Sequence, residues 1–129
     1  MILFLDTTTD MLCVALCSHK GRILRRKIFE RKEQGGNKTF RAIVALLGKN
    51  EPEGIIVATG AGRFSGIRHG VTIANTLSFA WGIRAVGIKK NLDEDTTTMI
   101  IRGIPLLARV RPMTFVLPSY DREPSITVS

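Results

Sequence analysis

Gly60-Ala61-Gly62-Arg63-Phe64-Ser65-Gly66-Ile67-Arg68-His69-Gly70 is the most informative segment of this 129-residue sequence. It follows the continuous apolar run at residues 55–58, typical of a strand buried on both faces, and precedes a predicted helix over residues 67–81. Three glycines at such a junction could let backbone N–H groups approach a phosphate. However, the G-x-G-x-x-x-G spacing is not the dinucleotide-binding fingerprint, and no G-K-[ST] follows. We therefore favour a tight structural turn over an anion-binding loop.

The chain before this segment predicts three strands and a helix. Residues 2–5, 12–18 and 22–30 are rich in strand formers and are separated by short polar turns, which favours an antiparallel meander. The poor alternation of residues 22–30 is consistent with an exposed edge strand. A helix is predicted after residue 38, because apolar residues recur at the i, i+3, i+4 and i+7 spacing. These residues are Phe40, Ile43, Val44 and Leu47.

After the helix at residues 67–81, residues 83–88 predict a further strand. The elements then follow in the order βββαβαβ, an α/β arrangement in which the two parallel connections should be right-handed. Residues 89–102 are polar and predict a linker or a weak helix. Residues 104–117 predict one or two short strands, and residues 118–129 a tail.

Composition and length indicate one globular domain, since 44% of the residues are hydrophobic and 23% are charged. The apolar start lacks the basic region of a signal peptide, and residues 71–83 are too short and too polar for a membrane span. Cys13 and Cys17 would lie about 13 Å apart on a regular strand, which is too far for a disulfide. With only His19 nearby, no metal site is predicted. We expect buried, reduced thiols in a cytoplasmic protein with no membrane association.

The net charge of +8 is concentrated in one segment. Residues 20–41 contain nine basic and two acidic side chains, whereas the rest of the chain contains ten basic and nine acidic ones. Such a segment could attract tRNA, and a stand-alone basic RNA-binding module is one candidate function. The same charges could instead protect an edge strand from aggregation. The candidate tRNA contacts are Arg22, Arg25, Arg26 and Lys27.

Two further segments, near the ends of the sequence, are distinctive. Residues 2–9 read I-L-F-L-D-T-T-T, and residues 118–127 read P-S-Y-D-R-E-P-S-I-T. Together with the glycine segment, they resemble the I-L-x-I-D-T-[AS], P-x-Y-x-[RK]-x-P and G-P-G-S-F-T-G-L-R-I-G patterns of the TsaB (YeaZ) family. The resemblance implies a single actin-like (ASKHA, RNase H-like) lobe with a five-stranded mixed sheet over residues 1–90. Residues 91–129 would be a remnant of the second lobe, so the chain resembles a shortened member.

The resemblance implies a non-catalytic scaffold subunit in the synthesis of threonylcarbamoyladenosine in tRNA. Its expected partners are a TsaD-type catalytic subunit, which it would bind and activate, and a TsaE-type ATPase. A homodimer is the alternative assembly for the chain alone. TsaB and TsaD meet largely through the first two helices of their first lobes. Carried over here, the predicted interface is Phe40, Ile43, Val44, Leu47, Ile67, Val71, Ala74 and Leu77.

The resemblance also assigns two polar segments. The family's glycine loop corresponds here to Gly60, Gly62, Arg63, Phe64, Ser65, Gly66 and Arg68. Asp6, Thr7 and Thr8 stand where nucleotide-binding relatives have a phosphate turn, but the glycine expected there is missing. Since β-branched threonine hinders the approach of a phosphate, we expect no tight ATP binding by this chain alone. A contribution to a nucleotide site shared with the partner remains open.

An enzyme is the remaining alternative. A reduced ASKHA-type phosphotransferase or hydrolase would use Asp6 to bind a metal or to act as a general base. Such sites usually need at least two more carboxylates near the first. The acidic residues at 51, 53 and 93–95 fall in predicted connectors, and nothing in the sequence brings them to Asp6. The sequence therefore predicts no catalytic residue.

Overall fold

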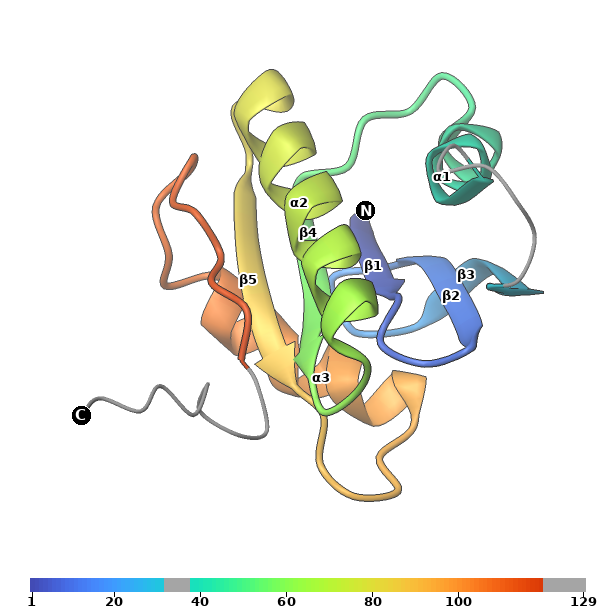
Figure 1. The fold of residues 1–129 in the computed structure, drawn as a ribbon. Helices are drawn as coiled ribbons and strands as arrows, with labels where there is room; N and C mark the ends of the chain where they lie inside the picture. The colour runs from blue at the N-terminus through green and yellow to red at the C-terminus, as the bar shows by residue number, and fades with distance from the viewer. Residues whose placement is uncertain (32–37, 120–129) are drawn as a thin grey trace.

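The computed structural model describes residues 1–31 and 38–119 as one mixed sheet with three helices (Figure 1). The elements are β1 (Ile2–Asp6), β2 (Met11–Cys17), β3 (Ile23–Glu30), α1 (Lys38–Leu47), β4 (Gly54–Gly60), α2 (Phe64–Trp81), β5 (Arg84–Lys89) and α3 (Thr96–Leu107). The predicted βββαβαβ order is confirmed, and α3 is added at its end.

The five strands lie in the order β3-β2-β1-β4-β5. The pairs β1–β2 and β2–β3 are antiparallel, because short polar turns join them. The pairs β1–β4 and β4–β5 are parallel, because a helix crosses over between the strands. The predicted five-stranded mixed sheet is therefore confirmed.

Helices cover both faces of the sheet, with α1 and α2 on one face and α3 on the other (Figure 1). Strand β1 alternates between the two resulting cores. Leu3 and Leu5 point to α1 and α2, whereas Ile2 and Phe4 point to α3. A strand covered on both faces needs apolar residues at every position, which explains the unbroken runs in β1 and β4.

The prediction of one or two short strands between residues 104 and 117 is wrong. Helix α3 extends to Leu107, and no strand is formed by residues 104–119. Met99, Ile100 and Leu107 are buried against the sheet, so α3 has an apolar face. Tertiary burial of such a face outweighs the low helix propensity of the three threonines at its start.

The segment after α3 runs beside β5 (Figure 1). The Met113 N–H donates to the Ile83 carbonyl at 3.3 Å. The Asn75 side chain bonds both backbone groups of Val116, at 2.7 and 3.0 Å. Through these contacts the segment flanks the β5 edge of the sheet.

Both thiols are buried, as predicted, and face the α3 core. Burial raises the pKa of the Cys17 thiol to about 11, so it is protonated at neutral pH. Among the described residues, no helix has both the length and the apolar character needed to cross a membrane.

Candidate functional site

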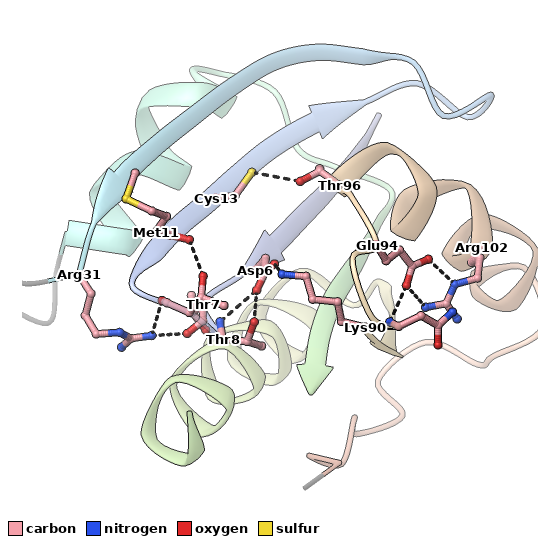
Figure 2. A network of polar contacts seen from close by, with 12 residues as sticks. Asp6, Thr7, Thr8, Met11, Cys13, Arg31, Lys90, Glu94, Thr96 and Arg102 are labelled. Carbon is pink, nitrogen blue, oxygen red and sulfur yellow. Dashed lines mark hydrogen bonds and ion pairs between the residues drawn. The ribbon is translucent and has the colours of Figure 1, made fainter. Parts of the chain in front are cut away.

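The carboxyl ends of the parallel strands β1, β4 and β5 meet at one edge of the sheet, where Asp6 ends β1. This carboxylate is buried, and its Oδ1 accepts hydrogen bonds from the Thr8 N–H at 3.0 Å and the Thr8 hydroxyl at 2.6 Å. The two bonds close a tight turn between β1 and β2 (Figure 2). In open α/β sheets, ligands bind at this edge, so the turn is the natural candidate site.

Lys90 binds the other oxygen of the same carboxylate. Its Nζ contacts Asp6 Oδ2 (Figure 2), at a distance of 3.2 Å, and its backbone N–H donates to the Gly60 carbonyl. Because Lys90 directly follows β5, this residue joins the ends of all three parallel strands. Each oxygen of Asp6 therefore already bonds a protein group.

The glycine loop packs directly on the turn. The Thr7 hydroxyl donates to the Gly66 carbonyl at 2.6 Å, and the Arg63 N–H donates to the Thr8 carbonyl at 2.8 Å. A Cβ atom at Gly66 or Gly70 would overlap Thr7. The close approach of α2 to the turn thus requires glycine at these positions, which supports the structural interpretation of the loop.

The other loop residues lie around the start of α2. A Cβ at Gly62 would overlap Thr8, and one at Gly60 would overlap the Ser119 backbone. Arg68 extends over Phe64, with its guanidinium 5.5 Å from the ring centroid. Phe64, Ser65 and Arg68 are all exposed. These three side chains therefore lie at the surface, whereas Gly60 and Gly66 are buried.

Two arginines flank the turn. Arg31 donates to the Thr7 carbonyl and, at 3.2 Å, to the Thr9 carbonyl (Figure 2). Arg63 lies 2.5 Å from the Asp10 carboxylate, so the cation predicted at the glycine loop is paired within the chain. A cavity of about 370 Å³ beside them is lined by Asp10, Glu30, Arg31 and Arg63. With two cations and two carboxylates, this lining has no net excess of positive charge.

The partner interface predicted on α1 and α2 is only partly accessible. Phe40 and Val44 on α1 are 48% and 51% exposed. The other six residues are buried in the core under α1 and α2: Ile43, Leu47, Ile67, Val71, Ala74 and Leu77. The structure corrects this part of the prediction, because the apolar stripe of each helix packs on its own sheet.

The helices α1 and α2 are joined at their N-terminal halves. His69 Nε2 on α2 lies 3.2 Å from Thr39 Oγ1 on α1. Burial, and to a lesser extent the Arg31 cation, lowers the pKa of His69 below its ordinary value of 6.5. The imidazole is therefore neutral at pH 7, and the exposed side of α1 is held in place beside α2.

The candidate tRNA contacts lie at the far side of the sheet from β5. Arg25, Arg26 and Lys27 belong to the edge strand β3, and Arg22 precedes it. All four are exposed, and the Arg25 guanidinium donates to the Leu46 carbonyl of α1 at 3.1 Å. The predicted exposed edge is confirmed, whereas contact with RNA stays a prediction.

Sequence reasoning missed Arg31 and Lys90. A signal existed for Lys90, because it directly follows a predicted parallel strand, and such strands end at the same edge of a sheet. The position of Arg31 depends on the length and register of β3, which no pattern indicated. Of the predicted tail motif, residues 120–127 lie outside the described residues, and the Ser119 N–H donates to the Thr59 carbonyl at 2.9 Å.

Comparison with solved structures finds the same fold in YeaZ from Pseudomonas aeruginosa. The identity is 24% and the TM-score 0.60, over 68% of this chain and 43% of that chain. The fold is also found in the structure of an uncharacterized protein with similarity to peptidase YeaZ from Pseudomonas aeruginosa. The identity there is 23% and the TM-score 0.56, over 68% of this chain and 42% of that chain.

The chain therefore spans less than half the length of the structures it matches. No protein-family model matches the sequence, and a search of curated proteins finds no match. At this level of identity the likeness shows the fold alone, and the predicted α/β lobe with one five-stranded mixed sheet is confirmed.

Proposed function

We propose that this chain is a TsaB-type subunit that binds and activates a TsaD-type threonylcarbamoyl transferase without itself being the catalyst. Two independent observations support the proposal. The motifs at residues 2–9 and 60–70 resemble those of the TsaB family, and the solved structures that share the fold include a YeaZ protein. Sequence motif and fold therefore point to one family. The proposed setting is tRNA adenosine modification in the cytoplasm, with a TsaE-type ATPase as a further partner.

The single observation that carries the pairing is the exposed apolar side of α1. The opposite side of this ten-residue helix is buried on the sheet, yet Phe40 and Val44 are half exposed. Phe64 at the start of α2 is also exposed, at 58%. Exposed apolar side chains that gather on one face of a protein are typical of a protein interface, and α1 and α2 cover the same face of the sheet. The proposed interface therefore consists of Phe40, Val44 and Phe64, in place of the eight residues predicted from the sequence.

The experiment that tests the pairing uses Val44→Glu. A carboxylate buried in an apolar interface lacks a partner, so we expect the dissociation constant for the TsaD-type protein of the same organism to rise at least about tenfold, or about 1.4 kcal/mol. Light scattering after co-purification, followed by calorimetric titration, measures this. Leu92→Glu is the matched control, because Leu92 is 92% exposed in the loop before α3.

Each outcome has a defined meaning. Weaker pairing for Val44→Glu, with Leu92→Glu binding as the wild type does, supports both the function and the interface. If both variants bind the TsaD-type protein as the wild type does, the proposed function stands but the proposed interface is wrong. If the wild-type chain did not bind the TsaD-type protein at all, the proposed function would be wrong. A homodimer that is lost in Val44→Glu would show that the same surface serves self-association.

A nucleotide site in this chain alone does not fit the turn at Asp6. Thr7 and Thr8 occupy the turn, and the Thr7 hydroxyl is already bonded to Gly66. Asp6 itself bonds Thr8 and Lys90, and none of its oxygens is without a protein partner. We therefore propose that this turn anchors α2, and that any nucleotide in the complex is held mainly by the partner.

The enzyme alternative has little support. Among residues 1–31 and 38–119, no group of three His, Cys, Asp or Glu side chains could hold a metal ion. Glu94 is bonded to Arg102 through both oxygens, and Asp95 caps α3. The connector carboxylates are therefore engaged within their own loop and helix rather than at Asp6. The test is an Asp6→Asn variant whose fold has been checked. If this variant still binds and activates the TsaD-type protein as the wild type does, the result agrees with a non-catalytic role.

A further inference from the structure

The two edges of the sheet differ. The segment at residues 113–119 flanks the β5 edge and donates a hydrogen bond to Ile83 just before that strand. The eight-residue strand β3 ends the sheet on the other side, and none of the described residues forms a strand beyond it. The outer N–H and C=O groups of such an edge are a template for an additional strand. The β3 edge is therefore the open one.

The β3 edge is basic on both faces of the sheet. Arg25 and Lys27 lie opposite Leu16 and Val14 and so share the α1 face. Arg26 lies opposite Ala15, on the α3 face. Within residues 1–31 and 38–119, no ion pair joins Arg22, Arg25, Arg26 or Lys27 to a carboxylate. The positive charge of this strand is available to a partner.

This charge argues against pairing with a second copy. Two β3 edges side by side would bring together two sets of basic side chains, and like charges on neighbouring strands are destabilising. An acidic strand would instead gain cross-strand pairs on both faces. Charge complementarity therefore selects a partner segment rich in aspartate or glutamate.

The apolar side chains of the same strand favour a protein over a nucleic acid. Leu24 and Ile28 are 51% and 52% exposed, and neighbouring Met11 is 50% exposed. Single-stranded RNA is bound by stacking its bases on aromatic rings. The only aromatic residue of β3, Phe29, is partly buried, with Lys38 Nζ 5.2 Å from its ring centroid. The strand thus offers apolar and backbone contacts but no exposed stacking platform.

We propose that the open edge of β3 binds an extended, acidic segment of a partner protein as a sixth strand of the sheet. Backbone hydrogen bonds along the strand supply affinity. Acidic side chains of the segment pair with Arg25, Arg26 and Lys27, and its apolar side chains cover Leu24 and Ile28. This inference does not depend on the proposed pairing through α1, which uses other residues.

The test uses a fluorescein-labelled peptide, matched in length to β3, with glutamate at both odd and even positions among valine and threonine, so that both faces of the strand carry acidic side chains. Fluorescence anisotropy measures its binding to the full chain. The triple variant Arg25→Glu, Arg26→Glu, Lys27→Glu should weaken binding at least tenfold. A double variant with Arg109→Glu and Arg111→Glu, two exposed residues after α3, should bind as the wild type does. Amide hydrogen exchange should slow in residues 23–30 when the peptide binds, whereas a peptide N-methylated at consecutive amides, which blocks both of its edges, should not bind.

Three outcomes would overturn the inference. The first is equal weakening by both sets of charge reversals, which would indicate non-specific attraction. The second is peptide binding without slower exchange in β3. The third is binding of an RNA oligonucleotide of equal charge, lost on reversal of Arg25, Arg26 and Lys27, with no peptide binding, which would make the edge an RNA contact. Thermal melting of each variant checks that the fold is intact.

Discussion

Gly70 lies inside α2, where replacing glycine by alanine normally stabilises a helix by about 1 kcal/mol. Here we expect the opposite sign, because a Cβ at this position would overlap the Thr7 hydroxyl. Gly70→Ala should lower the free energy of unfolding by about 1–3 kcal/mol, the usual cost of overpacking. Urea unfolding followed by the fluorescence of the single tryptophan, Trp81, measures this change.

Thr7→Ala provides the control for this overlap. It removes the obstructing oxygen together with the hydrogen bond to the Gly66 carbonyl. Gly70→Ala should therefore cost less in the Thr7→Ala background, with a coupling of about 0.5–3 kcal/mol. An equal cost in both backgrounds would show that the glycine is needed for another reason.

At the scale of elements, α3 depends on the cap at its N-terminus. The Asp95 carboxylate accepts a hydrogen bond from the Thr98 N–H at 2.8 Å, and this bond lowers the pKa of Asp95 below its ordinary value of 3.8. Asp95→Ala should lower the thermal midpoint at pH 7, whereas Asp95→Asn should lower it less, because asparagine also caps helices.

The pH dependence gives a second measure of the same cap. A carboxyl whose pKa is lowered in the folded state contributes stability above its unfolded pKa and loses it as the pH falls. The difference in midpoint between the wild type and Asp95→Ala should therefore shrink as the pH falls below 3.8. A difference that persisted at lower pH would mean that the charged carboxylate is not the stabilising form.

Elements with an unbroken apolar run or stripe were predictable from the sequence. Strands β1 and β4 and the helices α1 and α2 belong to this group. Helix α3 was predicted only in part, as the weak-helix alternative for residues 89–102, because threonines fill its first turn and Pro105 lies inside it. Of the candidate site, the turn at Asp6 and the glycine loop were located. Their contacts with Lys90 and Arg31 were not predicted, because these depend on where β5 and β3 end, and no local sequence pattern indicates that.

For the whole molecule, the two cores share one set of strands. Alternate residues of β1 and β4 enter opposite cores. Unfolding of these strands would therefore expose both cores at once. A probe exists for each core, since Trp81 packs against the α1–α2 core and Cys17 is buried in the α3 core. The two layers can therefore be followed separately in one unmodified chain.

We predict that the layers unfold in one transition, as is usual for a single domain of this size. Thiol labelling by a disulfide reagent across a urea series should give the same midpoint as Trp81 fluorescence, since a buried, protonated Cys17 thiol reacts only after unfolding. Labelling at lower urea than the fluorescence change would mean that α3 separates first as an independent unit. In that case α3 would unfold as an independent unit, whereas coincident midpoints would show that α3 unfolds cooperatively with the layer that carries α1.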